Sequence, residues 1–176
     1  MNAFTNRMMR AAKLDSLLYE EVEADKGAMV QAMGVVVLAS LAAGVGSVGT
    51  LGIGGILLGT LASLVGWYIW AYFTYFIGTK FLAEPQTEAD LGQLLRTTGF
   101  SSSPGLIRIL GIIPGVGTVV FAAASIWMLV AMVIAVRQAL DYTSTWRAVA
   151  VCAIGWIIQT VILALVFTFF GTPASL

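Results

Sequence analysis

Charged residues are absent from three long stretches of this chain, and this absence constrains the fold more than any other feature. The uncharged stretches cover 53 residues from Gly27 to Thr79, 28 residues from Ile109 to Val136, and 29 residues from Ala148 to Leu176. A helix needs about 20 apolar residues to cross the hydrocarbon core of a bilayer. We therefore predict an integral membrane protein in which the first stretch forms two spans and the last stretch forms one.

The composition agrees with a chain that has little surface for water. Of the 176 residues, 59% are hydrophobic and 10% are charged, whereas about a quarter of the residues in an average soluble domain are charged. The formal net charge is zero, so the composition gives no reason to expect a nucleic-acid partner.

Residues 1–26 carry charges of both signs and precede the first apolar stretch. Part of this segment has the spacing of a helix with one apolar face, formed by Met8, Leu14, Leu17, Leu18 and Val22. We predict an amphipathic helix over residues 8–25, and its acidic residues favour docking on a protein over binding to anionic lipid. The expected organisation is a cytoplasmic N-terminal segment (1–26) followed by a transmembrane domain (27–176).

The spans are expected in a definite order. The first runs from about Ala28 to Val45, and a glycine-rich turn, GVGSVGTLGIGG, leads to a second span from about Ile53 to Phe81. The last span covers Arg147 to Phe170.

The polar linker that follows the second span should contain one short helix. Thr87 and Asp90 resemble helix-capping residues, so we expect a helix that runs through Leu95 and is broken at Gly99 and Pro104.

Two positive charges, Arg137 and Arg147, decide the topology, because Lys and Arg concentrate in cytoplasmic loops. A single span over 109–136 would place both of them outside. If the chain instead enters near Pro104 and turns at a Pro-Gly-Val-Gly sequence, all nine basic residues face the cytoplasm.

The second topology requires a short third segment. It has about ten to thirteen residues, which cover less than about 20 Å of a roughly 30 Å core. We favour an all-α polytopic membrane helix bundle with five embedded segments, the third broken at Pro114, Gly115 and Gly117, and a cytoplasmic N terminus in the cell membrane. Four full spans are the alternative.

The second span holds two groups of candidate contact residues. Aromatic side chains beside Lys80 are typical of an interfacial membrane anchor; they are Trp67, Tyr68, Trp70, Tyr72 and Tyr75. Small residues at four-residue spacing let another helix approach closely, inside the protein or in a partner; they are Gly55, Gly59 and Ser63, with Gly66 beside them.

The sequence contains no histidine, which removes the commonest general base, most zinc sites and imidazole ligation of haem. The carboxylates lie in watery segments where a pKa suited to catalysis is not expected. We predict no catalytic or metal site and no intrinsic cofactor, with contact to lipid or pigment left open.

Several blocks resemble the prokaryotic branch of the Ypt-interacting-protein (Yip) domain family. They are LDSLLYEEVEADKGAMVQAMGVVVLASLAAGVG, YFIGTKFL, RTTGFSSSPGLIRILGIIPGVG and WMLVAMVIAVRQALDYTSTWRA. The resemblance implies a compact five-segment membrane domain with a cytoplasmic N terminus. Eukaryotic members are adaptors in vesicle traffic that bind small GTPases through N-terminal regions. An extended soluble N-terminal domain is not expected here, so a small GTPase is not the predicted partner.

The leading hypothesis is a non-catalytic membrane scaffold or accessory subunit of a larger membrane protein complex, such as a respiratory or photosynthetic one. One alternative is a small transporter or channel that works through the broken helix at Pro114. Another is a subunit that contacts pigment, quinone or lipid through the aromatic block 67–76.

Overall fold

The computed structural model describes residues 2–170, except for the side chains of residues 48–53, 163, 166, 167, 169 and 170. Over these residues the chain is helical and has no strand. The elements are α1 (Ala3–Ala12), α2 (Ser16–Ala24), α3 (Ala28–Gly46), α4 (Val48–Lys80), α5 (Leu91–Phe100), the 3₁₀ helix η1 (Ser103–Ile112), α6 (Gly117–Ala139) and α7 (Thr145–Phe170). The predicted all-α fold is confirmed.

Four of the described helices, α3, α4, α6 and α7, are long and apolar enough to cross a membrane. Their outer faces carry large exposed apolar side chains, such as Leu58 on α4 and Val119 on α6, each 70% exposed. Because water would not stabilise such a surface, these faces contact lipid. The chain is a multi-pass membrane protein.

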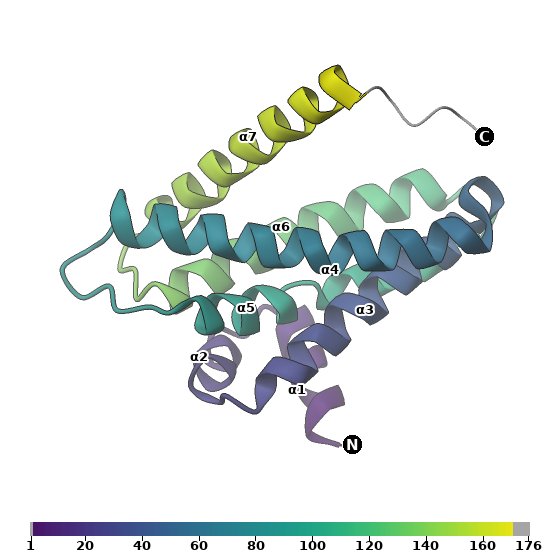
Figure 1. Ribbon diagram of the computed structural model, residues 1–176. Helices are drawn as coiled ribbons and strands as arrows, with labels where there is room; N and C mark the ends of the chain where they lie inside the picture. Colours follow the sequence, from purple (N-terminus) through teal and green to yellow (C-terminus); the bar gives the residue numbers. More distant parts are fainter. Residues whose placement is uncertain (1, 171–176) are drawn as a thin grey trace.

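The long helices do not form a closed bundle. The helices α3 and α4 make a hairpin, α6 packs against η1, α5 and α7, and α7 diverges from the others towards its C-terminal end (Figure 1). Trp156 and Ile157 of α7 are 68% and 58% exposed.

The short third segment is η1, which packs between α3 and α6. A 3₁₀ helix rises about 2.0 Å per residue, so the ten residues of η1 cover about 20 Å. Gly115, with φ +85°, turns the chain before α6 begins at Gly117. The helix break predicted at Pro114, Gly115 and Gly117 therefore joins η1 to α6, whereas crossing of the membrane by η1 stays a prediction.

Glycines allow η1 to lie this close to its neighbours. A Cβ on Gly105 would lie 2.9 Å from the sulfur of Met128 and 3.3 Å from the Cβ of Ala39. A Cβ on Gly46 at the end of α3 would collide with the backbone oxygen of Arg108. Side chains at these positions would push η1 away from α3 and α6.

The N-terminal segment differs from the prediction of one amphipathic helix. It forms two helices, because Leu14 takes a left-handed conformation (φ 63°) and Asp15 caps α2 by accepting a hydrogen bond from the Leu17 amide at 3.0 Å. Of the predicted apolar face, Leu18 and Val22 are buried, whereas Leu17 is 65% exposed.

Two further predictions about glycine are wrong. The predicted glycine-rich turn is almost wholly helical, since α3 continues through Gly46 and α4 starts at Val48. Gly99 does not break the helix after Asp90. Asp90 and Gln93 form a capping box, and α5 continues to Phe100.

Close packing between α5 and α3 explains why a glycine stands at position 99 of the helix. A Cβ on Gly99 would lie 2.7 Å from the Ala32 Cβ and 3.1 Å from the Ala32 oxygen. We predict that Gly99→Ala lowers the unfolding free energy by about 1–3 kcal/mol because the two helices must separate. The measurement is thermal unfolding in detergent. Gly54→Ala is the control, since a Cβ there meets nothing within 4 Å, and equal stability losses in the two variants would contradict this packing.

Candidate functional site

Polar side chains from the connecting loops meet at one end of the bundle. The Glu84 carboxylate accepts hydrogen bonds from the backbone N–H (3.0 Å) and hydroxyl (2.8 Å) of Thr143, and it forms an ion pair with Arg147 at 3.2 Å. The bonds from the Thr143 backbone and hydroxyl lower the pKa of Glu84 to about 2. The loop after α4 is thereby joined to the start of α7.

The N-terminal helices are fastened to the same end through Arg96 of α5. Its buried guanidinium donates from Nε to the backbone oxygens of Val22 (2.9 Å) and Glu23 (3.1 Å), and from Nη2 to Glu23 as well. The Trp127 indole on α6 donates to the Ala12 oxygen at 2.8 Å. These bonds fix α1 and α2 against the membrane domain.

Four carboxylates lie near one another on this end, and we call Glu20, Glu23, Asp90 and Asp141 the acidic cluster. Glu20 accepts from Gln138 at 2.7 Å, and Glu23 accepts from Gln93 at 3.0 Å. Burial raises the pKa of Glu23 to about 7, and the negative charges of its neighbours add to this effect. No group of three or more candidate metal ligands is found among the described residues.

The raised pKa of Glu23 makes stability depend on pH in a defined direction. Between its ordinary pKa of 4.5 and about 7, the folded protein keeps a proton that the unfolded chain releases. Stability is therefore lost as the pH rises through this window. We predict that Glu23→Gln stabilises the protein above pH 7 and has no effect below pH 4.5. Because solvent partly screens the charge, the expected stabilisation is about 1 kcal/mol.

Thermal unfolding across pH 4 to 8 measures this difference, and Glu21→Gln provides a control of opposite sign. Hydrogen bonds from Arg10 and Arg7 lower the pKa of Glu21. Its stabilising effect is present above pH 4.5 and is lost as the pH falls, so Glu21→Gln should destabilise the protein at neutral pH. A Glu23→Gln effect that does not vary with pH would contradict the pKa assignment.

The aromatic block of α4 is divided between two faces. Trp67 points inward and donates from Nε1 to the Leu95 oxygen and to the Thr98 hydroxyl, both at 3.2 Å. Trp70 also faces inward and lies against Gly155 of α7. Tyr68 and Tyr72 are about half exposed, and Tyr75 is partly buried. Membrane anchoring by the tyrosines remains a prediction, whereas both tryptophans contact other parts of the protein.

The small residues of α4 face a cavity. Gly55, Gly59, Ser63 and Gly66 line a space of about 470 Å³ among α3, α4, η1 and α6, with Gln159 as the α7 residue in its described lining. A Cβ at Gly59 or Gly66 would meet nothing within 4 Å. These glycines do not hold two helices of the described chain together, and contact with a partner helix stays a prediction.

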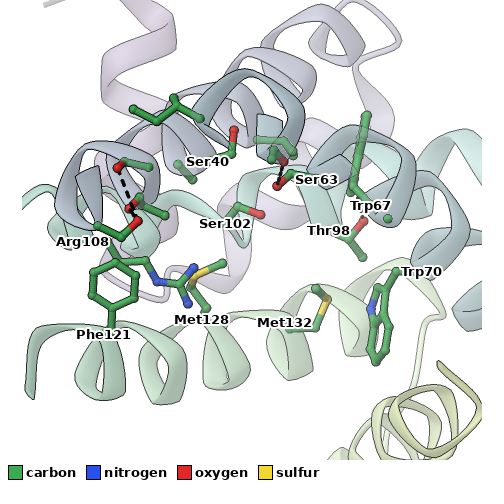
Figure 2. A pocket seen from close by; sticks show the side chains of 18 of the residues that line it. Ser40, Ser63, Trp67, Trp70, Thr98, Ser102, Arg108, Phe121, Met128 and Met132 are labelled. Carbon is green, nitrogen blue, oxygen red and sulfur yellow. Dashed lines mark hydrogen bonds between the residues drawn. The ribbon is translucent and has the colours of Figure 1, made fainter. Parts of the chain in front are cut away.

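Arg108 enters the other side of this cavity (Figure 2). The topology favoured from the sequence places Arg108 with the other basic residues on the cytoplasmic side. In the structure, η1 carries it towards the α3–α4 hairpin, where its backbone lies beside Gly46. The direction of η1 cannot be read from a ten-residue apolar segment, so the side of the membrane on which Arg108 lies stays a prediction. Gln159 also lines this cavity, which the sequence does not reveal because it is formed by residues far apart in the chain.

A family model described as the Yip1 domain matches residues 19–167. No curated protein and no solved structure matches the chain.

Proposed function

The chain belongs to the Yip1 domain family, and on this premise we propose that it is a non-catalytic scaffold that holds other membrane proteins in an assembly. The observation that carries the proposal is the polar end of the bundle. There, Arg96 and Glu84 fix the loops and N-terminal helices into one surface that bears the acidic cluster.

A surface of this kind suits protein recognition. Groups that are already ordered lose little conformational entropy when they bind, and negative charge attracts a basic segment of a partner. The same charge repels anionic lipid headgroups. The proposed partner is therefore a membrane protein with a basic segment beside its span.

We place the N terminus in the cytoplasm. Lys80, Arg137 and Arg147 lie in the terminal turns of α4, α6 and α7 at the polar end, and basic residues at the ends of spans concentrate on the cytoplasmic side. The cytoplasmic membrane is the proposed location.

The transporter alternative receives less support. Transporters place broken helices near the middle of the membrane, where backbone groups and polar side chains bind the substrate. The break at Pro114 is instead an exposed turn between η1 and α6. Flux through proteoliposomes that Pro114→Ala abolishes would favour transport over the scaffold.

The scaffold proposal predicts a stoichiometric membrane partner. The full chain is extracted from native membranes in mild detergent, captured through a tag, and its associated proteins are identified by mass spectrometry. We expect the double variant Glu20→Gln/Asp141→Asn to lose at least about tenfold in retained partner, because charge pairs at interfaces contribute more than about 1.4 kcal/mol when desolvated. Raised salt should weaken the interaction as well.

Lys26→Gln is the control, since it removes a charge of opposite sign from an exposed position near α2. It should retain the partner. The proposal fails if the purified wild-type chain is a monodisperse monomer and no stoichiometric partner is captured.

A further inference from the structure

Two buried side-chain nitrogens have no hydrogen-bond partner among the described residues. Both belong to side chains that line the cavity among α3, α4, η1 and α6. They are Nε of Arg108 and Nε1 of Trp70, which lie towards opposite ends of the cavity (Figure 2). Both groups can only donate hydrogen bonds. A buried donor without an acceptor is costly, and most of all on a charged group, so Arg108 Nε indicates a missing molecule that offers an acceptor at its end of the cavity.

The surroundings of Arg108 specify the charge of that molecule. Its Nη2 donates to the Ser125 hydroxyl at 3.0 Å, and its Cζ lies 5.6 Å from the centre of the Phe121 ring. No described carboxylate forms an ion pair with it, and residues 91–140 contain no Asp or Glu at all. A positive charge between membrane-spanning helices is stabilised by an opposite charge or by backbone carbonyls. Neither kind of group among the described residues accepts from Arg108 Nε, so a bound anion is the partner that this charge favours.

The shape of the cavity specifies the rest of the molecule. Its α4 side runs from Gly55 to Trp70, which is about 22 Å at 1.5 Å per residue. Between these ends the α4 lining includes Gly59, Ser63 and Gly66, and Met128 and Met132 of α6 line it from another side. This long surface of small and apolar residues suits a hydrocarbon chain.

We propose that the cavity binds an anionic phospholipid, with the phosphate on Arg108 and an acyl chain along the small residues of α4. Inorganic phosphate would satisfy Arg108 but would leave the apolar part of the cavity empty. A zwitterionic lipid would bring an ammonium group for which residues 91–140 supply no carboxylate. The volume of about 470 Å³ is within the usual range of about 300–1,000 Å³ for ligand pockets.

This lipid site goes beyond the scaffold function and does not depend on it. The acidic cluster lies at the polar end, whereas the Arg108 backbone lies beside Gly46, where α3 ends and the chain turns into α4. Loss of a protein partner would therefore leave lipid binding unchanged.

Native mass spectrometry of the full-length protein in detergent tests the proposal. The added probes are phosphatidylglycerol, phosphatidylcholine with the same acyl chains, oleate and inorganic phosphate. We expect one phosphatidylglycerol to be retained with roughly tenfold preference over phosphatidylcholine. Both lipids offer Arg108 the same phosphate oxygens, but the choline ammonium cancels the negative charge, and a difference of about 1.4 kcal/mol corresponds to that ratio. Inorganic phosphate and oleate should not displace it at equal concentration.

Two variants distinguish recognition of the lipid headgroup from binding of the acyl chain. Arg108→Gln should abolish the preference for phosphatidylglycerol, and Lys80→Gln is its control because it removes an exposed positive charge outside the cavity. Gly59→Leu should fill the cavity and weaken the binding of both lipids. Gly54→Leu is the matched control, since a Cβ there also meets nothing within 4 Å but the residue is not part of the lining.

Several results would overturn the lipid site. Equal retention of the two phospholipids by the wild-type protein would overturn it. This result does not depend on whether any variant folds. Displacement by inorganic phosphate would indicate a simple anion site, and displacement by oleate would indicate a fatty-acid site. Unchanged preference in a folded Arg108→Gln protein would show that another group recognises the headgroup.

Discussion

The packing of η1 between α3 and α6 is the constraint on which the rest of the structure depends. Inside a bilayer, backbone polar groups must be satisfied within the protein, so a ten-residue segment is stable there only when neighbouring helices cover it. Gly46 and Gly105 permit that approach, because a Cβ at either position would collide with an atom of a neighbouring element. The position of η1 in turn fixes where α6 begins and where Arg108 lies.

The arrangement separates two kinds of chemistry between the two ends of the structure. At the polar end, charged groups are paired with one another or with backbone groups, as Arg96 is with α2 and Glu84 is with Thr143. Near the α3–α4 hairpin, Arg108 has a serine hydroxyl and an aromatic ring as neighbours, but no carboxylate. The polar end, where charged groups are paired, suits a rigid protein-binding surface. Arg108, which has no carboxylate partner among the described residues, suits an anion from outside the chain.

The sequence predicted the long helices because a span depends on a property that the chain displays directly, a run of about 20 apolar residues. It also predicted the break at Pro114, where the backbone preferences of proline and glycine are local. It failed where tertiary contacts decide the conformation. The helix α5 continues through Gly99, whose missing side chain lets α3 approach, and Gly59 lines a cavity that its spacing alone does not reveal.

Labelling from the two sides of the membrane tests the course of η1 most directly. With Cys152 replaced by Ser, single cysteines are placed at Val116, in the turn before α6, and at Gln86, in the loop after α4; Gln86 is exposed and Val116 is 38% exposed. A membrane-impermeant maleimide should label Val116→Cys from the outside of oriented vesicles and Gln86→Cys from the cytoplasmic side. Labelling of both positions from the same side would mean that η1 does not carry the chain to the opposite end, and it would contradict the positions assigned to Arg108 and to the cavity.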